Sequence, residues 1–243
     1  MTDTLIFDQV HLGVPDPEAA ARWYVQHLGA TPGDNTDRIW FGRTRAIFLK
    51  NATPAPSRGS AIDHIALSYP DVAAKAASLE SAGVTVLPSA VTTPVSDAPG
   101  LGRYAYIADP WGATIQLVEE PGAPTFHHVH LQVPDPDATR RWYLERFGGE
   151  QASLKGRLDG IKYGEVWVFL DKGTAQPSRG HTIDHIGWRM PDLAARAADF
   201  RRQGITFTTE PQPGPPGAFS PVLMSFAEDP WGVKIELLQR RGE

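Results

Sequence analysis

Short stretches in which apolar and polar residues alternate are separated along this chain by segments whose apolar residues recur at helical spacing. The first alternating stretch, residues 10–14, has the two-residue period of a β-strand. Residues 17–28 follow with helical spacing, between Asp16, which can cap the helix start, and Gly29, which can end it. Strand patterns then continue to Leu49. The pattern therefore predicts one β-α-β-β-β unit at the start of the chain.

The same order of elements recurs three more times. The second unit has a strand at residues 64–68, an Ala-rich helix at 72–81 and strands at 84–86, 104–107 and 114–118. Residues 126–170 and 183–239 repeat these two units. We therefore predict an α+β fold of four β-α-β-β-β units.

Matching motifs indicate that the second half of the chain repeats the first. Three motifs recur at offsets of 119, 121 and 120 residues. They are Phe7–Pro17 with Phe126–Pro136, Ile62–Ile65 with Ile183–Ile186, and Asp109–Gly112 with Asp229–Gly232. A period of this length corresponds to a whole domain. We therefore predict two tandem domains, residues 1–120 and 121–243, joined by a Pro/Gly-rich linker at residues 119–124.

The composition limits the chemistry. The chain has 243 residues, a formal net charge of −5 and no cysteine, which excludes disulfides and thiolate metal ligands. Any metal site must then use His, Asp, Glu or Gln. No Lys/Arg cluster stands out, so we expect no nucleic-acid binding. No apolar run approaches the ~18 residues of a membrane span, and no signal peptide is visible, so we expect a cytoplasmic protein.

Three residues in strand patterns of the second half have side chains suited to metal binding: His130, His185 and Glu236. A buried sheet face lined with such polar groups is costly unless something satisfies them. Two imidazoles and one carboxylate form the facial set that leaves open positions on the ion for oxygen ligands. We therefore predict one divalent ion in the second half, with Fe(II) favoured and Mn, Zn or Ni as alternatives.

The first half keeps His11 and His64 but has Gln116 where the second half has Glu236. Glutamine can ligate through its carbonyl oxygen but adds no charge, so affinity for a divalent ion should fall. Three interpretations remain open: a structural domain whose site has degenerated, a weak second metal site, or a metal-free ligand pocket. We favour the degenerate domain.

The Asp-His-Ile motif, and the Asp-Pro-Trp-Gly motif that precedes Ile-Glu-Leu, resemble those of the vicinal oxygen chelate (VOC) superfamily. This superfamily includes glyoxalase I, fosfomycin- and bleomycin-resistance proteins, methylmalonyl-CoA epimerase and extradiol dioxygenases. The resemblance covers nearly the whole chain. It implies that two units pair into a curved mixed sheet, a cup that holds the metal with the helices outside. It also implies that His130, His185 and Glu236 are the metal ligands.

Departures from the family pattern narrow the expected chemistry. Glyoxalase I and the epimerase use a fourth ligand, whose place is taken by Phe169 in the second domain and Phe48 in the first. Ring-cleaving dioxygenases commonly add an acid–base His and a Tyr near the metal, but the matching residues here are Leu170 and Phe226. His128 is then the expected substitute base.

Other residues have expected roles at the site. Glu165 is either a general base or a solvated charge, and Arg189 either binds a substrate carboxylate or phosphate or pairs with an acid. An aromatic-tolerant substrate pocket is predicted from Trp167, Phe169, Met224 and Phe226. Long Pro/Gly-rich stretches at residues 88–102 and 211–221 are either lids or mobile surface loops.

These features favour a metal-dependent enzyme that binds a small aromatic or enolisable substrate through two neighbouring oxygens. A ring-cleaving or other oxygenase-type reaction leads, and a glyoxalase-type lyase, isomerase or transferase comes next. The competing class is a drug- or ligand-binding resistance protein that binds without turnover. We expect a small-molecule ligand, no membrane partner, and a monomer or homodimer.

Overall fold

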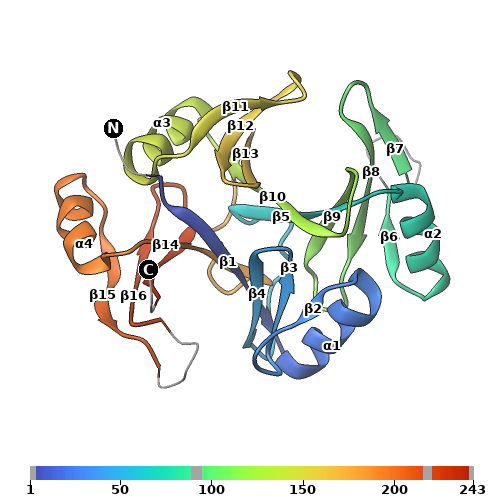
Figure 1. Cartoon of the computed structure of the whole chain (residues 1–243), viewed down its shortest axis with the longest axis horizontal. Helices are drawn as coiled ribbons and strands as arrows, with labels where there is room; N and C mark the ends of the chain where they lie inside the picture. The colour runs from blue at the N-terminus through green and yellow to red at the C-terminus, as the bar shows by residue number, and fades with distance from the viewer. Residues whose placement is uncertain (1–3, 89–94, 216–220, 241–243) are drawn as a thin grey trace.

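The computed structural model describes residues 4–88, 95–215 and 221–240. In these ranges the elements follow the predicted order, with one extra strand, β7, in the second unit (Figure 1). The described helices are α1 (Pro17–Leu28), α2 (Val72–Ser81), α3 (Pro136–Phe147) and α4 (Leu193–Arg202). The described part contains no helix that is long and apolar enough to cross a membrane.

The described strands form two mixed sheets, so the predicted α+β fold is confirmed. The β1–β14 sheet has eight strands in the order β15 (Phe207–Pro213), β16 (Leu223–Glu228), β17 (Lys234–Gln239), β14 (Ile183–Arg189), β1 (Ile6–Val14), β4 (Thr44–Lys50), β3 (Arg38–Phe41) and β2 (Thr31–Pro32). The β5–β10 sheet has nine: β11 (Glu150–Leu154), β12 (Leu158–Tyr163), β13 (Val166–Lys172), β10 (Thr125–Val133), β5 (Ile62–Tyr69), β9 (Thr114–Glu119), β8 (Gly102–Ala108) and β6 (Thr85–Leu87), with β7 (Val95–Ala98) paired to β8.

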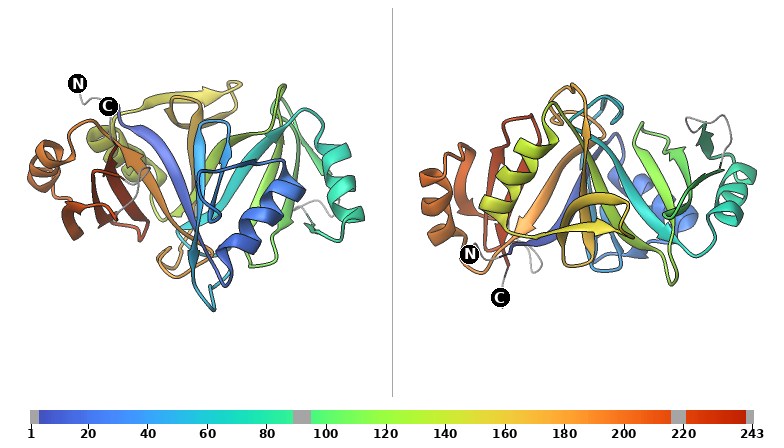
Figure 2. Two further views of the ribbon diagram at one scale, coloured as in Figure 1. Left: turned by 60° about the horizontal axis from the view of Figure 1, so that its bottom comes forward. Right: turned by 90° about the horizontal axis from the view of Figure 1, so that it is seen from above.

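Each sheet combines units from both halves of the chain, and this corrects the expected pairing. The first unit joins the fourth through antiparallel β1 and β14, and the second unit joins the third through antiparallel β5 and β10. Figure 2 shows blue N-terminal strands beside orange C-terminal ones. Residues 1–120 and 121–243 are therefore sequence repeats that do not each form a separate sheet.

The connections between units explain this arrangement. Residues 120–124 join β9 to β10, and both strands lie beside β5, so a short linker only has to cross that one strand. The connections β4–β5 and β13–β14 are longer, and they run from one sheet to the other. They pair with each other at Ala55–His181 and Ser60–Gln176. The Pro/Gly-rich linker that indicated a domain boundary is thus a crossing within one sheet.

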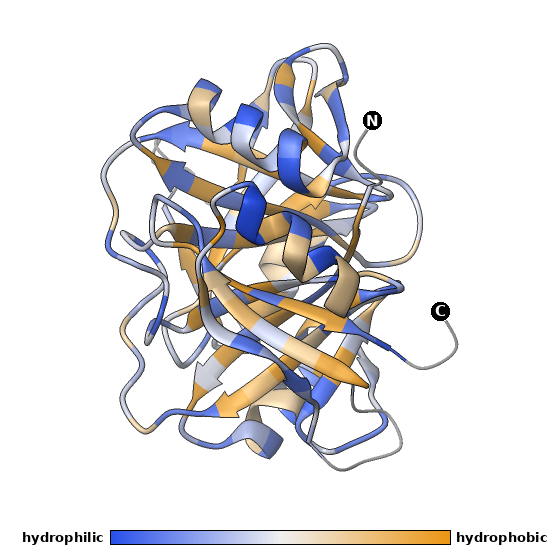
Figure 3. Ribbon diagram, turned by 90° about the vertical axis from the view of Figure 1, so that its left-hand side faces the viewer, coloured by the Kyte–Doolittle hydropathy of each residue, from blue (hydrophilic) through white to orange (hydrophobic). Residues whose placement is uncertain are grey.

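The helices cover the apolar faces of the sheets. Helices α1 and α4 pack on strands of the β1–β14 sheet, and α2 and α3 on strands of the β5–β10 sheet. Strands in Figure 3 alternate between hydrophobic and hydrophilic residues, as the sequence pattern predicts. Val10, Leu12 and Tyr24 are fully buried, and Tyr24 packs on Phe48 with 5.0 Å between ring centroids. The opposite face of β1 is thereby left for His11 and other polar residues.

Aspartates begin all four described helices. Each accepts a hydrogen bond from the backbone N–H three residues later: Asp16, Asp71, Asp135 and Asp192. Gly29 ends α1 with φ 75°, a conformation that glycine adopts without strain. These signals confirm the predicted ends of α1 and act locally, whichever units share a sheet.

The Asp-Pro-Trp-Gly motifs form turns that tie the two sheets together. Asp109 accepts hydrogen bonds from the backbone N–H groups of Trp111 and Ala113 (2.9 and 2.7 Å) and from the Tyr24 hydroxyl (2.9 Å). Asp229 makes the same contacts in the fourth unit, with the Tyr143 hydroxyl. Because Tyr24 belongs to the first unit and Asp109 to the second, each bond joins a helix on one sheet to a turn of the other.

Candidate metal centres

Among the residues that the structure describes, two side-chain clusters have metal-binding character, one on each sheet. The His-His-Glu cluster consists of His11, His185 and Glu236, and the three-histidine cluster of His64, His128 and His130. Within each cluster, one ligand atom of every residue lies within 4.8 Å of the others.

Strand register brings the His-His-Glu cluster together. His11 on β1 is paired directly with His185 on β14, and their rings stack with centroids 4.1 Å apart. Glu236 lies on β17, the next strand, with its Oε2 3.1 Å from His11 Nε2 and 3.6 Å from His185 Nε2. All three side chains are buried. Both halves of the chain therefore contribute to this one cluster.

These donors fit a divalent ion. Nε2 of His185 is buried and has no hydrogen-bond partner within residues 4–88, 95–215 and 221–240, an arrangement that calls for a ligand. Asp184 Oδ1 lies 2.6 Å from His185 Nδ1, and Lys234 donates to the same oxygen. A carboxylate on the far nitrogen commonly orients a metal-binding histidine, and here it leaves Nε2 facing Glu236.

Burial and proximity favour the protonation states that bind metals. Burial lowers the pKa of His11, and the neighbouring His185 lowers it further, so the imidazole stays neutral. Burial opposes ionisation of Glu236, but contacts with His11 and His185 outweigh it and hold the pKa of this carboxyl well below its usual range. A neutral imidazole and an ionised carboxylate are the forms that coordinate an ion.

Gln9 extends the polar face of β1 two residues before His11. Its Nε2 donates to Glu236 Oε2 (2.5 Å), and Arg240 donates to its Oε1 (2.9 Å). Gly187 lies opposite Gln9 on β14, where a Cβ would come within 2.9 Å of Gln9 Cγ. The glycine therefore makes room for the amide that orients the glutamate.

The His-His-Glu cluster lines a cavity of about 340 Å³. Apolar and cationic side chains share its walls: Ile47, Met224, Phe226, Arg38, Arg45, Lys234 and Arg240. Pro215 and Pro221 line it too, so the described ends of the predicted 211–221 loop border the site, while residues 216–220 lie outside the described residues. Likewise, residues 89–94 of the predicted 88–102 loop are not described.

Arg45 is the least satisfied cation of this cavity. Its Nε and Nη1 are buried without a hydrogen-bond partner among the described residues, although the guanidinium lies over the Trp40 ring at 4.5 Å. Burial lowers the pKa of Arg45, and the nearby Arg240 adds to this. Buried guanidinium N–H donors without a partner are suited to a carboxylate or phosphate group.

The predicted triad of His130, His185 and Glu236 does not converge, and this corrects the expected metal site. His130 lies on β10 in the other sheet, where its direct partner is His64. The position opposite His185 is held by His11 of the first unit. The error comes from the pairing of the units rather than from the residue types.

The place expected for a fourth ligand holds Ile47 rather than Phe48. Parallel pairing of β1 with β4 sets Ile47 beside His11, whereas Phe48 is paired with Leu12 and packs under helix α1. In the other sheet, Phe169, the residue expected at the fourth-ligand position, is paired with His130. Neither Ile47 nor Phe169 can coordinate an ion.

The other predicted pocket residues divide between the sheets. Met224 and Phe226 line the His-His-Glu cavity. Trp167 and Phe169 stack on each other in the β5–β10 sheet (5.4 Å between centroids), and His128 belongs to the three-histidine cluster. The interpretation of His128 as a catalytic base beside the metal site of Glu236 is therefore wrong.

Glu165 and Arg189 line neither the His-His-Glu cavity nor the cavities beside the three-histidine cluster. Glu165 is exposed in the turn between β12 and β13. Arg189 Nε lies 3.5 Å from Asp8 Oδ1 and borders a separate cavity with Met190. The non-catalytic alternatives, a solvated charge and a pair with an acid, match these positions.

The three-histidine cluster spans two strands. His64 on β5 is paired with His130 on β10, with ring centroids 4.7 Å apart, and His128 lies two residues before His130. Burial lowers the pKa of both His64 and His128. The Tyr106 ring lies perpendicular to the His64 ring, with 5.3 Å between their centroids.

Sequence reasoning did not predict that His11 pairs with His185. It also did not predict the hydrogen bond from Gln9 to Glu236 or the place of Arg45 in the cavity wall. One signal was present in the sequence: Gln9-Val10-His11 matches His128-Val129-His130, so both first strands carry two polar side chains on one face. Arg45 gave no signal, because a single arginine in a strand pattern is usually exposed.

The chain belongs to the glyoxalase/bleomycin resistance protein/dioxygenase superfamily, whose sequence model matches residues 6–117 and again residues 125–237. This confirms the resemblance to the VOC superfamily and the tandem repeat. A comparison of the sequence with curated proteins gives no match.

Among solved structures, glyoxalase I from Zea mays is similar with a TM-score of 0.76 and 17% identity, over 97% of this chain and 92% of that one. A protein from Bacillus subtilis subsp. subtilis str. 168, described as a candidate dioxygenase, has a TM-score of 0.69 and 17% identity, over 99% and 87% of the two chains. The cppA protein from Streptococcus pneumoniae TIGR4 has a TM-score of 0.54 and 11% identity, over 98% and 99%. At such identities the likeness concerns the fold alone.

Proposed function

We propose that this protein is a metal-dependent enzyme whose ion is held by His11, His185 and Glu236. The observation that carries the proposal is the convergence of these three buried donors, from three strands and both halves of the chain, beside a cavity. Two imidazoles and a carboxylate suit Fe(II) best, with Mn(II), Zn(II) or Ni(II) as alternatives.

The number of ligands bears on the reaction. With Ile47 in the fourth position, the protein supplies three donors and leaves positions for two neighbouring oxygens of a substrate and for a further small molecule. An ion in this site supplies Lewis acidity or the capacity to activate dioxygen. An oxygenase-type reaction on a small aromatic or enolisable compound therefore leads.

The cavity walls support a substrate that is anionic at one end and apolar at the other. Arg45 offers buried N–H donors to a carboxylate or phosphate. Met224 and Phe226 offer apolar surface in the cavity, and the Phe226 ring lies perpendicular to the His185 imidazole with 5.4 Å between centroids. Lys234, which lines the cavity and donates to Asp184, is the group that holds or delivers a proton at its Nζ.

One observation favours a second candidate. Phe226 stands where ring-cleaving dioxygenases commonly have a tyrosine. The hydroxyl that assists the reaction in those enzymes is therefore missing from this cavity. Proton transfer by Lys234 without dioxygen then suits a glyoxalase-type lyase, isomerase or transferase. The two candidates share the same metal site and differ in whether oxygen is consumed.

Anaerobic metal analysis tests the shared site. Loss of a residue that only hydrogen-bonds to a metal ligand lowers metal affinity roughly 10–100-fold. Glu236→Ala removes a ligand itself, so we expect its Fe(II) affinity to fall by more than that. Gln116→Ala, the matched change in the other sheet, should leave Fe(II) binding at the His-His-Glu cluster unchanged. Equal and negligible iron in wild type and Glu236→Ala would instead indicate a ligand-binding protein without turnover.

Activity assays then separate the two candidates. Oxygen uptake by the iron-loaded wild type with catechols and enolisable acids, absent in Glu236→Ala, supports the oxygenase. Substrate conversion under nitrogen, with the same dependence on Glu236, supports the lyase, isomerase or transferase.

A further inference from the structure

The three-histidine cluster occupies the place in the β5–β10 sheet that the His-His-Glu cluster occupies in the β1–β14 sheet. His64 is paired with His130 across antiparallel strands, just as His185 is paired with His11. The register is irregular on both sides of each pair, at matching positions of β1 and β10. Two of the three donors are therefore equivalent in the two clusters.

The third donor differs. Gln116 on β9 is paired with Tyr106, in the way that Glu236 on β17 is paired with Phe226. The carboxylate of the first cluster thus has a neutral amide as its counterpart in the second. If nothing replaced it, the second cluster would be left with only two strong ligands.

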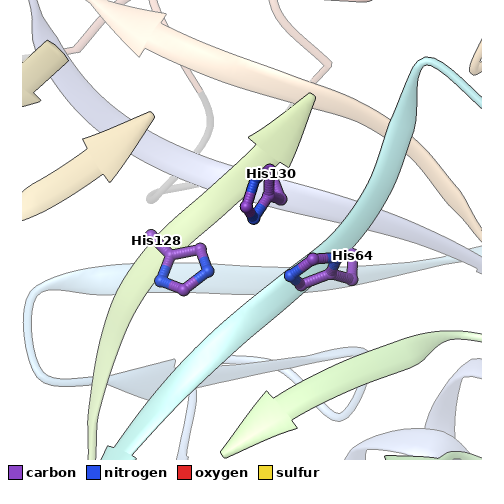
Figure 4. Close-up of side chains that lie close together, drawn as sticks. All are labelled: His64, His128 and His130. Atoms are coloured by element: carbon purple, nitrogen blue, oxygen red, sulfur yellow. The ribbon is translucent and has the colours of Figure 1, made fainter. Parts of the chain in front are cut away.

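His128 replaces the missing ligand from another direction. It is paired with Ala66 on β5, and the equivalent residue of the first sheet is Gln9, which is paired with Gly187. Figure 4 shows His128, His130 and His64 gathered on adjacent strands. The two sheets therefore differ by an exchange of side chains. The β1–β14 sheet has glutamine on β1 and glutamate on β17, whereas the β5–β10 sheet has histidine on β10 and glutamine on β9.

The ring nitrogens of the cluster are arranged as in a metal site. His64 Nδ1 lies 2.8 Å from Asp63 Oδ1, and His128 Nδ1 lies 2.8 Å from His127 Nδ1. These contacts leave Nε2 of both rings buried, and neither Nε2 has a hydrogen-bond partner in the described part of the chain. His64 and His128 are 4% and 3% exposed, so both rings are largely shielded from bulk solvent.

We propose that His64, His128 and His130 form a second metal site, which binds Zn²⁺ through three imidazoles. Three histidines with an open fourth position form a donor set that suits zinc. Without a carboxylate, the set contributes no charge and disfavours the ions that prefer oxygen ligands, such as Mn²⁺. Asp63 and Asp171, which contact His64 and His130 (2.8 and 3.1 Å), partly balance the charge of the ion.

The ion would be accessible to a small ligand. His128 and His130 line a cavity of about 240 Å³, and His64 and His130 line another of about 330 Å³. Tyr104 and Tyr106 belong to both. A water molecule or a small oxygen or nitrogen donor is the class of ligand that fits the remaining position.

Zinc titration of the metal-stripped full chain tests this site apart from the His-His-Glu cluster. We expect wild type to bind two equivalents of Zn²⁺ and Glu236→Ala to keep one. His128→Gln installs the residue that the other sheet carries at Gln9, and its zinc affinity at this site should fall by more than ~100-fold. X-ray absorption of zinc-loaded Glu236→Ala should report three imidazoles and no protein carboxylate.

Two further variants complete the test. His27→Gln, on α1 outside both clusters, should keep both equivalents. Gln116→Glu should restore a carboxylate and raise the affinity of this site for Fe(II) and Mn²⁺. Zinc binding by Glu236→Ala that is unaffected by His128→Gln would overturn the proposal, as would no zinc binding by a Glu236→Ala protein with wild-type circular dichroism.

Discussion

Ile47 stands beside His11 where a fourth metal ligand would lie, and its side chain lines the cavity. Ile47→Glu would add a carboxylate within reach of an ion at the His-His-Glu cluster. We expect metal affinity to rise at least ~10-fold, equivalent to about 1.4 kcal/mol, because the added ligand is charged. Substrate turnover should fall, because a position needed by the substrate is filled.

Isothermal titration with Zn²⁺ and the assay that detects wild-type activity measure the two effects. Ile47→Leu changes the shape of the side chain without adding a donor, and it should leave both quantities close to wild type. Tighter metal binding by Ile47→Leu, or unchanged turnover in Ile47→Glu, would argue against three ligands and an open face at this cluster.

Arg45 is the residue on which the anionic character of the substrate depends. Loss of its buried N–H donors in Arg45→Gln should raise KM at least ~10-fold, since a hydrogen bond to a charged group contributes about 1.5–3 kcal/mol. The value of kcat should change less, because the arginine holds the anionic end of the substrate and not the end that reacts at the metal. Arg43→Gln, an exposed change in the same β3–β4 hairpin, serves as the control. Equal KM values in the two variants would remove Arg45 from the substrate site.

At the scale of elements, the sequence predicts best what local interactions determine. Asp16 caps α1 through the backbone N–H of Ala19, and Gly29 ends the helix, so both ends are specified within a few residues. The Asp-Pro-Trp-Gly turn is similarly local, because Asp109 accepts hydrogen bonds from the backbone N–H groups of Trp111 and Ala113, two and four residues later. What the motif did not predict is its bond to Tyr24 in another unit.

The buried turn aspartate predicts a pH dependence of stability. Burial raises the pKa of Asp109 to about 6, although hydrogen bonds from Ala113 and Tyr24 act in the opposite direction. Between pH ~4 and ~6 the folded state therefore holds a proton that the unfolded state has released. Stability contributed by this group is largest below pH ~4 and falls as the pH rises to about 6.

Asp109→Asn removes this titration while keeping an oxygen for the backbone N–H groups. We expect the free energy of unfolding of the variant, relative to that of wild type, to increase between pH 4 and pH 7 by up to about 3 kcal/mol. Urea unfolding at several pH values measures the difference. Exposed Asp159→Asn should run parallel to wild type, and a parallel curve for Asp109→Asn as well would show that the buried carboxyl titrates normally.

At the scale of the whole molecule, the sequence leaves the pairing of units undecided. Ile62–Ile65 and Ile183–Ile186 are the same four residues, so β1 has two candidate partners with the same local pattern. Only the chain connections and the packing between sheets distinguish them, and these are not periodic features of the sequence. The predicted triad failed for this reason, since His130 and His185 are found in different sheets.

The pairing also predicts how the halves behave when they are separated. Fragment 1–120 carries β1 and β5, whose central partners β14 and β10 lie in fragment 121–243, so each fragment exposes two long strand edges. We expect each fragment alone to aggregate or self-associate, and the co-expressed fragments to form a 1:1 complex with native-like circular dichroism. Because His11 lies in one fragment and both His185 and Glu236 in the other, only the complex should bind Fe(II) tightly. Co-expression with Glu236→Ala should preserve the complex and abolish that binding, whereas a folded, monomeric 121–243 fragment that binds iron through Glu236 by itself would contradict the pairing of units.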